Sequence, residues 1–543
     1  MKTRGKISII GAVVTFALTF MSTNAFANAI EIDIQNDINV KPANKSITLT
    51  PIDASTNLYE TSKFGELLGP ESVAFKSDGG VYLLDNLKEK VILYSKEGSI
   101  ENIVDIKGLK IAKVAAAKDD TMMLLNAADG KIYINNRNKF DEYVIKNLRL
   151  ELLSDFGVTN DNKPFVFLSD SDLGRTYVFD LQDNVANVSE IITGRLAAEG
   201  DIFTSELIVD KGLDVGHNCV VTIYKGTNSI KIPISSIHWI SGAKYLGVQN
   251  GNYIIQTFEF ENEKDNTAVS QNYIRTYDKN GKELNCIPVD ENYKYIQNDV
   301  VLVDGTIKSI NLKDSCISIN ELDSDVKKTD ILKSMQSEPE LQAMNGVNTT
   351  KVPAYASVKR SLIQTTVKSY WSCSWYCSQN NYIGATSGWT RPHYITNYNV
   401  QYQCIPYNWG GWDTHAGFLS KISNGKTAGN INTSNVFSGY AGVDCSGYVQ
   451  RCWGINDAKK NTTMLDSASI SQSVQASNLK FGDAWNSTGH IMIYEKLDAY
   501  GNYVLYEATL LNNYDRVAHT TRPVASVQSS YHSIRRLNII EDV

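Results

Sequence analysis

The chain has 543 residues, of which 52 are Lys or Arg and 59 are Asp or Glu, so its formal net charge is −7. This length implies at least two domains. The acidic balance and the lack of a Lys/Arg cluster argue against nucleic-acid binding, because phosphate contacts require such clusters. Eight cysteines are too few for a fold that is held together mainly by disulfides.

Residues 1–27 have the pattern of a secretory signal peptide. Three basic residues precede an apolar run from Ile9 to Phe20, and Ala25-Phe26-Ala27 provides an A-x-A cleavage site. The apolar core is too short to span a bilayer comfortably, and the alternative is an uncleaved anchor. Cleavage removes three positive charges and changes the net charge from −7 to −10. We therefore expect a secreted protein, extracellular or associated with the cell wall, with no stable membrane insertion after cleavage.

Residues 28–54 are polar and poor in aromatic residues, and we interpret them as a poorly ordered leader segment. Residues 55–335 consist of short β-rich runs separated by Asp, Asn, Gly and Lys turns. The runs recur about every 45 residues, the length of a four-stranded propeller blade, and about six such units fit. We predict an all-β, β-propeller-like domain; an irregular pair of β-sandwiches or a β-solenoid is the alternative.

The first of these units carries the clearest motif, with GPESVAF, VYLLDN and VILYSKEG in residues 69–98. This unit resembles a blade of the NHL-type β-propellers, and the likeness fades in the later units. We expect a targeting or substrate-holding role for this domain, with an unknown ligand, because propellers host many functions.

Residues 336–385 are predicted to be a linker followed by a helical segment. The linker is charged and polar, whereas Pro353–Tyr376 has apolar residues at helical spacing and is expected to pack onto the next domain. Cys373 and Cys377 in this segment fit a local disulfide and an unbonded helical i,i+4 pair equally well.

The stretch VDCSGYV, residues 443–449, is the strongest candidate for chemistry. Asp444 and Ser446 are typical helix-start residues, and the apolar residues that follow suit a buried helix face. Cys445 is therefore expected at a helix N-terminus, where the positive end of the dipole favours a thiolate nucleophile. On the residue alone, half of a disulfide or a small buried side chain is the alternative.

Two downstream residues complete a catalytic arrangement. His490 opens the alternating run IMIY, and Glu507 lies near the end of a second run, YVLYE, after a short turn. Paired as an antiparallel hairpin, the two strands bring His490 and Glu507 close enough to interact. A nucleophile, a base and an orienting group are the requirements of Cys/His catalysis. His415 and then His393 are alternative bases.

Four blocks in order, IPYNWGG (405–411), VDCSGYV, LKFGD and GHIMIYE, resemble the signature of the NlpC-type cell-wall peptidases. These papain-like bacterial cysteine hydrolases cut the peptide stems of peptidoglycan. The resemblance implies an α+β papain-like domain at residues 386–543, with Cys445 as the nucleophile, His490 as the base and Glu507 as the third residue. It also implies peptidoglycan as the partner. We predict no cofactor, and no metal site, because no histidine sits at ligand spacing beside Cys373 and Cys377.

The resemblance assigns further roles near the nucleophile. Tyr407 would line the oxyanion side, together with the backbone at Ser446, and Asp444 could meet the free amine of a trimmed stem peptide. Gly410-Gly411 allows close backbone approach beside the nucleophile. Among the many aromatic residues of this region, most are expected in the core, and Trp409 and Trp412 are expected with Tyr407 in a substrate groove.

These expectations combine into a secreted thiol hydrolase that acts on bacterial wall peptides. An amidase or an acyltransferase that uses the same thiol is one alternative. The other is a propeller-based binding or adhesion protein, in which the papain-like domain is accessory or inactive.

Overall fold

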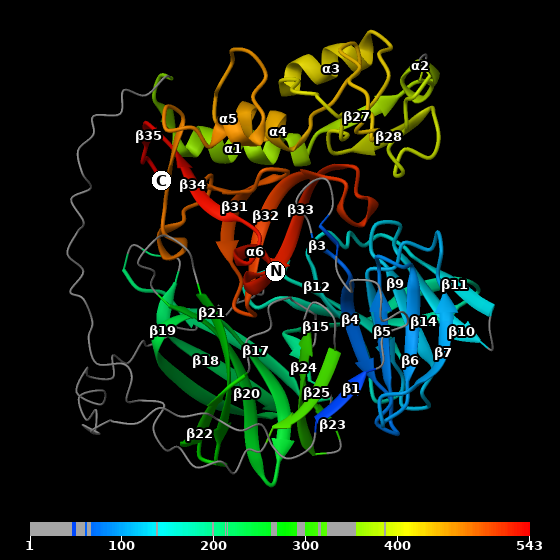
Figure 1. Cartoon of the computed structure of the whole chain (residues 1–543), viewed down its shortest axis with the longest axis vertical. Coiled ribbons are helices and arrows are strands. Elements are labelled where there is room, and N and C mark those ends of the chain that lie inside the picture. The colour runs from blue at the N-terminus through cyan, green and yellow to red at the C-terminus, as the bar shows by residue number, and fades with distance from the viewer. Residues whose placement is uncertain are drawn as a thin grey trace, which may run out of the picture. The chain divides into compact units, whose positions relative to one another are not determined.

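The computed structural model describes residues 46–49, 60–61, 67–136, 139–197, 200–211, 213, 215–261, 269–289, 299–303, 305–312, 317–322, 355–384 and 387–543. These residues belong to one compact unit, formed by Lys41–Lys328 and Asn345–Val543 (Figure 1). The expected signal peptide and most of the expected linker lie outside the described residues. Among the described residues, no helix is long and apolar enough to cross a membrane.

The N-terminal part consists of four-stranded antiparallel units. The first sheet has the order β4-β5-β6-β7. A brief parallel pairing of β11 with β15 joins the next two units into an eight-stranded sheet. The strands of these three units are β4 (Pro70–Phe75), β5 (Val81–Asp85), β6 (Lys90–Tyr94), β7 (Ile100–Asp105), β8 (Lys113–Ala116), β9 (Met122–Asn126), β10 (Lys131–Asn136), β11 (Lys139–Ile145), β12 (Leu153–Val158), β13 (Pro164–Leu168), β14 (Arg175–Gln182) and β15 (Val185–Thr193).

Two more units share one long strand, β19 (Asn228–Gln249). Its first half pairs with β18 and its second half with β20, so it is the last strand of one unit and the first strand of the next. Their other strands are β16 (Arg195–Leu196), β17 (Ile202–Ile208), β18 (Gly216–Lys225), β20 (Asn252–Glu261), β21 (Val269–Tyr277) and β22 (Glu283–Pro288).

The last unit closes the ring with a strand from the N-terminal side of the chain. Strand β1 (Ser46–Leu49) pairs with β25 in the order β1-β25-β24-β23. Residues 46–49, assigned to the leader by sequence, are therefore part of this sheet, because their alternating side chains complete its buried face. The remaining strands are β23 (Val300–Val303), β24 (Thr306–Leu312), β25 (Ile317–Leu322) and a separate pair, β2 (Glu60–Thr61) with β3 (Leu67–Leu68).

Packing between the sheets explains why the second strands of the first three units are mostly apolar. Every residue of β5, β9 and β13 is buried, because each of these strands has a neighbouring sheet on both faces. Shared hydrophobic clusters join each sheet to the next, and one cluster joins the first sheet to the last: Val81 and Ile92 pack with Ile310 and Ile317. Six four-stranded sheets packed in a closed ring form a β-propeller, which confirms that part of the sequence prediction.

The C-terminal part is built on a six-stranded antiparallel sheet with the order β29-β34-β30-β31-β32-β33. Its strands are β29 (Ser471–Ser473), β30 (Ala484–Asn486), β31 (Ile491–Leu497), β32 (Asn502–Thr509), β33 (Arg516–Pro523) and β34 (His532–Arg536). The other elements are β26 (Val358–Lys359), α1 (Arg360–Trp371), β27 (Ser374–Cys377), α2 (Gln379–Tyr382), β28 (Val400–Gln403), α3 (His415–Ser423), α4 (Cys445–Cys452), α5 (Thr462–Leu465), η3 (Ala476–Asn478), η4 (Leu511–Asn513), α6 (Val524–Gln528) and β35 (Ile539–Ile540).

The two faces of this sheet have different partners. Helices α1 and α4 cover one face, where Val367 and Val449 pack with Ile491 and Ile493 in one core. The opposite face packs with Trp239, Val215 and Phe260 of the propeller. The expectation that the helical segment packs onto the C-terminal domain is confirmed by the position of α1.

The two nearby cysteines follow neither of the expected alternatives. Cys373 precedes β27 and Cys377 ends it, and both thiols are free. The helical rhythm stops at Trp371, and the chain then pairs with β28 as an antiparallel strand, so an i,i+4 helical pair cannot form.

The turn between β31 and β32 anchors the sheet in the propeller. Tyr500 lies in a propeller core cluster, with its ring 4.8 Å from that of Phe167. Gly242 faces this turn so closely that a Cβ there would lie 2.0 Å from the Gly501 nitrogen. Ser169 donates a 2.6 Å hydrogen bond to Asp498. The hairpin formed by β31 and β32 is therefore held at its turn by the propeller.

Candidate active site

Helix α4 begins at Cys445, as the sequence predicts. Asp444 caps the helix, with its side chain accepting a 2.7 Å hydrogen bond from the Gly447 nitrogen. The first turn of α4 contacts the Gly410-Gly411 loop, since a Cβ on Gly447 would lie 2.1 Å from the Gly411 carbonyl oxygen. The Cys445 thiol is free, and the residue is 5% exposed. This position places the sulfur at the positive end of a buried helix.

His490 lies immediately before β31 and joins Cys445 to Glu507. Its Nε2 is 2.8 Å from Glu507 Oε2, and the Cys445 side chain lies close enough to interact with the ring. Since Nε2 faces the carboxylate, Nδ1 is the ring nitrogen left for the thiol. Burial lowers the pKa of His490, but the hydrogen bonds and charges of Cys445 and Glu507 outweigh burial and raise it to about 10. The imidazole therefore carries a proton at neutral pH.

Glu507 is fully buried on β32 and held by the neighbouring strand β33. Thr520 donates to Oε1 at 2.6 Å, and Arg522 donates to Oε1 at 3.0 Å and to Oε2 at 2.5 Å. Burial raises the pKa of Glu507, but the charge of Arg522 and the hydrogen bond with His490 hold it well below its usual range. Glu507 is therefore ionised and fixed, and it orients the imidazole.

Asp444 and Ser446 flank the nucleophile and share one lysine. Lys459 Nζ lies 2.8 Å from Asp444 Oδ1 and donates a 2.5 Å hydrogen bond to Ser446 Oγ. Asp444 Oδ2 also accepts a hydrogen bond from the Gly410 nitrogen at 3.0 Å. The Lys459 ammonium group therefore already pairs with the Asp444 carboxylate. The clearest role of Asp444 is to fix the loop and the helix start around Cys445.

The three aromatic site residues lie in the segment that pairs with the residues before Cys445. Tyr407 and Trp412 both form backbone bridges to Val443, and Tyr407 is 2% exposed. The Arg451 guanidinium lies 4.2 Å above the Trp412 ring and donates to its carbonyl oxygen. Trp409 is half-buried against the core. The structure therefore brings the backbone of Tyr407 and Trp412 beside the residue that precedes Asp444, and Glu507 reaches the site through His490.

The two alternative bases lie in other surroundings. The His393 Nδ1 is 2.5 Å from Asp515 Oδ2, and the backbone nitrogen of His393 donates to the same oxygen. His415 begins α3, with its ring 6.1 Å from that of Tyr370. We therefore retain His490 as the base.

Sequence reasoning missed Arg522, Thr520 and Lys459. Thr520 and Arg522 are two positions apart on one strand, so they share the face that meets Glu507. That alternation was visible in the sequence, but the register that places it beside Glu507 was not.

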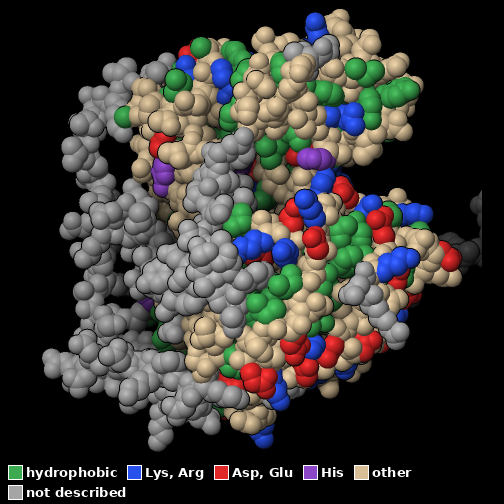
Figure 2. All heavy atoms as spheres, turned by 45° about the vertical axis from the view of Figure 1, so that its right-hand side comes forward, with side chains coloured by type: hydrophobic (Ala, Val, Ile, Leu, Met, Phe, Trp, Pro, Cys, Tyr) green, Lys and Arg blue, Asp and Glu red, His purple; other side chains and the backbone are tan. Residues whose placement is uncertain are grey.

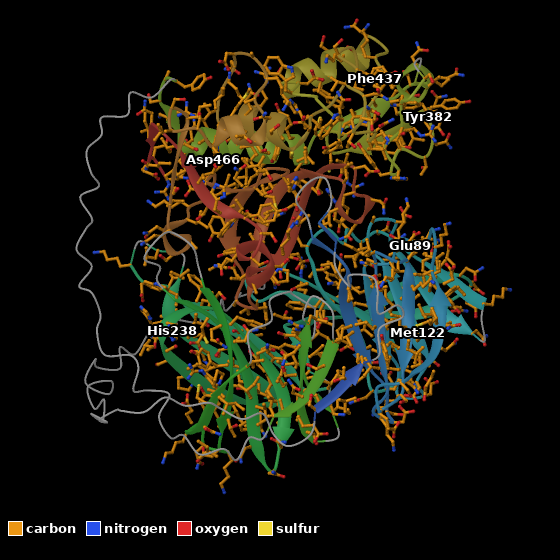
Figure 3. All side chains as sticks on the ribbon, in the orientation of Figure 1. Glu89, Met122, His238, Tyr382, Phe437 and Asp466 are labelled. Carbon is orange, nitrogen blue, oxygen red and sulfur yellow. The ribbon has the colours of Figure 1, made fainter. Side chains whose placement is uncertain are left out.

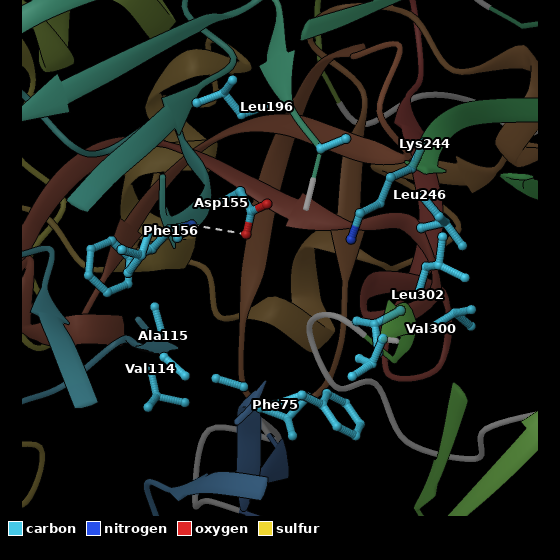
Figure 4. A pocket seen from close by; sticks show the side chains of 18 of the residues that line it. Phe75, Val114, Ala115, Asp155, Phe156, Leu196, Lys244, Leu246, Val300 and Leu302 are labelled. Carbon is cyan, nitrogen blue, oxygen red and sulfur yellow. Dashed lines mark hydrogen bonds between the residues drawn. The ribbon is translucent and has the colours of Figure 1, made fainter. Parts of the chain in front are cut away.

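A second concave site lies in the propeller. A cavity of about 230 Å³ is lined by the first strands of the six sheets, and Asp155 and Lys244 both point into it (Figure 4). Burial and the charge of Arg195 lower the pKa of Lys244 to about 8. The cavity is the central channel of the propeller.

His238, labelled in Figure 3, lies on β19, and its ring stacks 6.0 Å from that of Tyr273.

The chain is similar to several solved structures at low sequence identity. No family model and no curated protein matches the sequence. Virginiamycin B lyase from Staphylococcus aureus is similar at 11% identity over 49% of this chain and 99% of its own, with a TM-score of 0.30. A DUF4221 family member from Bacteroides vulgatus is 10% identical over 51% of this chain and 96% of its own, with a TM-score of 0.32. The Dos1 propeller is 12% identical over 48% of this chain and 80% of its own, with a TM-score of 0.29.

Each of these matches spans about half of the chain. The propeller architecture rests on the chain's own strand pairings.

Proposed function

We propose that this protein is a secreted cysteine hydrolase that cuts the peptide stems of bacterial peptidoglycan, with Cys445, His490 and Glu507 as its catalytic residues. The observation that carries the proposal is that one imidazole, His490, interacts with the Cys445 side chain and pairs with the buried carboxylate of Glu507. The wall-peptide substrate comes from the resemblance of the four sequence blocks to the NlpC-type, papain-like peptidases. The propeller serves as the targeting or substrate-holding domain.

The mechanism is covalent acyl transfer. The Cys445 sulfur attacks the scissile carbonyl, and the His490 imidazolium donates its proton to the departing amine. The neutral imidazole then takes a proton from water as the water oxygen attacks the thioester carbon. The C–S bond breaks and the acid product leaves, which restores the thiolate and the imidazolium. Glu507 keeps the ring oriented and stabilises its charged form, as the third residue of a triad does.

The first-turn N–H groups of α4 are suited to bind the oxyanion, because helix N-termini leave backbone donors without intrahelical partners. The Tyr407 hydroxyl is a further candidate donor. Loss of one such donor typically lowers the rate on the order of 10²–10³-fold.

The test uses the mature chain and its Cys445→Ala variant with purified peptidoglycan, and the released fragments are identified by mass spectrometry. The proposal expects stem-peptide fragments from the wild type and none from the variant. The same fragments from both proteins, or none from either, would remove the hydrolase proposal. Fragments that carry a new acyl acceptor in place of water would instead identify an acyltransferase that uses the same thiol.

A further inference from the structure

A groove separate from the thiol site lies among β27, β28, α2 and α3. Its volume is about 750 Å³, which lies inside the range of ligand sites in proteins. These four elements lie together in Figure 1, at the end of the C-terminal domain that carries Tyr382 in Figure 3.

The floor of the groove is apolar and rigid. It is formed by Trp375 of β27 with Leu419 and Ile422 of α3. The Trp375 indole donates a 2.9 Å hydrogen bond to the Cys404 carbonyl oxygen, and its ring meets that of Phe418 edge to face at 5.6 Å. A floor fixed in this way loses little conformational entropy when a ligand binds.

The rim of the groove is polar and exposed. Tyr376 is 52% exposed, so its ring offers both an apolar face and a hydroxyl group. Gly425 has φ +69°, and a Cβ there would lie 3.2 Å from Asn380 Nδ2, so the Asn380 side chain lies close against Gly425. The rim comprises Ser374, Tyr376, Asn380, Gln401, Ser423 and Asn424.

None of the described residues that line the groove carries a charge. In Figure 2, charged side chains crowd the propeller, whereas the C-terminal domain above it is mostly uncharged. Amide and hydroxyl groups donate and accept hydrogen bonds without selecting for charge. A sugar ring presents the same combination of an apolar face and hydroxyl edges. Peptide stems and peptide termini carry carboxylates and amines, for which this groove offers no counter-charge.

We propose that this groove is a subsite for a neutral oligosaccharide, with Tyr376 stacking on a sugar ring and the rim amides and hydroxyls bonding to its hydroxyl groups. This proposal rests on the proposed function only where it names the polymer. If the protein acts on the bacterial wall, the oligosaccharide is the glycan strand of the wall. A neutral glucan has the same chemistry, so the test includes both sources.

The experiment titrates the full chain carrying Cys445→Ala with the N-acetylglucosamine tetramer and, separately, with a β-1,4-linked glucose tetramer, by isothermal calorimetry. We expect at least one tetramer to bind and Tyr376→Ala to weaken it at least about tenfold. The control is Tyr398→Ala, which removes a tyrosine that is 40% exposed and outside the groove lining, and which leaves the affinity unchanged.

Binding of the N-acetylated tetramer in preference to the glucose tetramer identifies wall glycan, and the reverse preference identifies a glucan. The inference is overturned if neither tetramer binds, if Tyr376→Ala binds as tightly as its parent, or if a stem peptide displaces the tetramer. Because the titrated chain lacks the nucleophile, a failure of wall hydrolysis leaves this result unaffected, and a failure of binding leaves the hydrolysis test unaffected.

Discussion

The C-terminal sheet contains one buried and one partly buried histidine–glutamate pair, with different surroundings. His490 pairs with Glu507, and its ring also interacts with the Cys445 side chain. His519 of β33 pairs with Glu495, but its ring lies flat on Tyr506, with centroids 3.9 Å apart and planes 1° apart. The His519 Nδ1 is buried with no hydrogen-bond partner among the described residues.

Strand alternation separates the two environments. Tyr506 stands opposite His519, and Glu507 stands opposite Ala518, so the two pairs use opposite faces of the sheet. A histidine bonded to a carboxylate is therefore not sufficient for the proposed chemistry. What distinguishes His490 is the thiol at the start of α4 and an arginine-bound carboxylate behind the ring.

The largest expected effect comes from removing each histidine in turn. His490→Ala should lower the rate of wall hydrolysis on the order of 10³-fold or more, because the acid–base group is lost. His519→Ala should leave the rate per folded molecule within about threefold of the wild type while lowering the free energy of unfolding by about 1–3 kcal/mol. Fragment release and urea denaturation are the measurements. An equal loss of rate in both variants would contradict the distinction between the pairs.

The carboxylates provide the next test. Glu507→Gln should lower the rate on the order of 10²-fold or more, since it removes the charge that orients the imidazole. Because that charge raises the pKa of His490, its loss should also move the alkaline limb of the pH–rate profile to lower pH. Glu495→Gln is the matched control and should leave that limb in place. A shifted limb in Glu495→Gln would argue against the assignment.

The turn of the catalytic hairpin gives a stability test. Tyr500→Ala should lower the free energy of unfolding by about 3 kcal/mol, because it empties a site in the propeller core. Tyr224 of β18, which is 38% exposed, provides the control, and Tyr224→Ala should change stability by less than about 0.5 kcal/mol. Urea denaturation followed by tryptophan fluorescence compares the two variants. Equal stability would mean that the propeller does not hold the hairpin.

The smallest effect is the pH dependence of stability. The pKa of His490 is raised from 6.5 to about 10 in the folded chain. The contribution of His490 to the free energy of unfolding is therefore complete below pH 6.5 and is lost as the pH rises toward 10. The pKa of Glu507 is lowered, so its contribution is present above about pH 4.5 and is lost as the pH falls further. The alkaline loss should be on the order of 1–2 kcal/mol larger in the wild type than in His490→Gln. If the urea midpoints of the wild type and of His490→Gln change in parallel between pH 6.5 and 10, this prediction is wrong.

The local parts of the site could be predicted from the sequence. The Asp-Cys-Ser-Gly pattern predicted that Cys445 lies at or near a helix N-terminus, and α4 begins at Cys445. Alternating apolar residues predicted the two strands after His490, and these are β31 and β32. Helix caps and strand periodicity depend on neighbours a few residues away, which a single sequence contains.

The remaining features depend on partners distant in sequence. Nothing near Arg522 indicates that it faces Glu507, because the register of β33 on β32 decides that contact. Likewise, β1 completes a sheet with β25, which follows it by more than 250 residues. The boundary between two propeller units inside β19 could not be predicted either, because the strand continues from one unit into the next without a turn.

The central claim is that the Cys445 thiol and the His490 imidazole act as one unit, and alkylation tests it most directly. Iodoacetamide is added at pH 7, and the modified cysteines are identified by peptide mapping. Burial raises the pKa of five other thiols, which should react slowly: Cys219, Cys373, Cys377, Cys404 and Cys452. Cys445 should react faster than these five and should slow at least about tenfold in His490→Ala. A slower reaction of Cys445 than of these five thiols, or an unchanged rate in His490→Ala, would contradict the account.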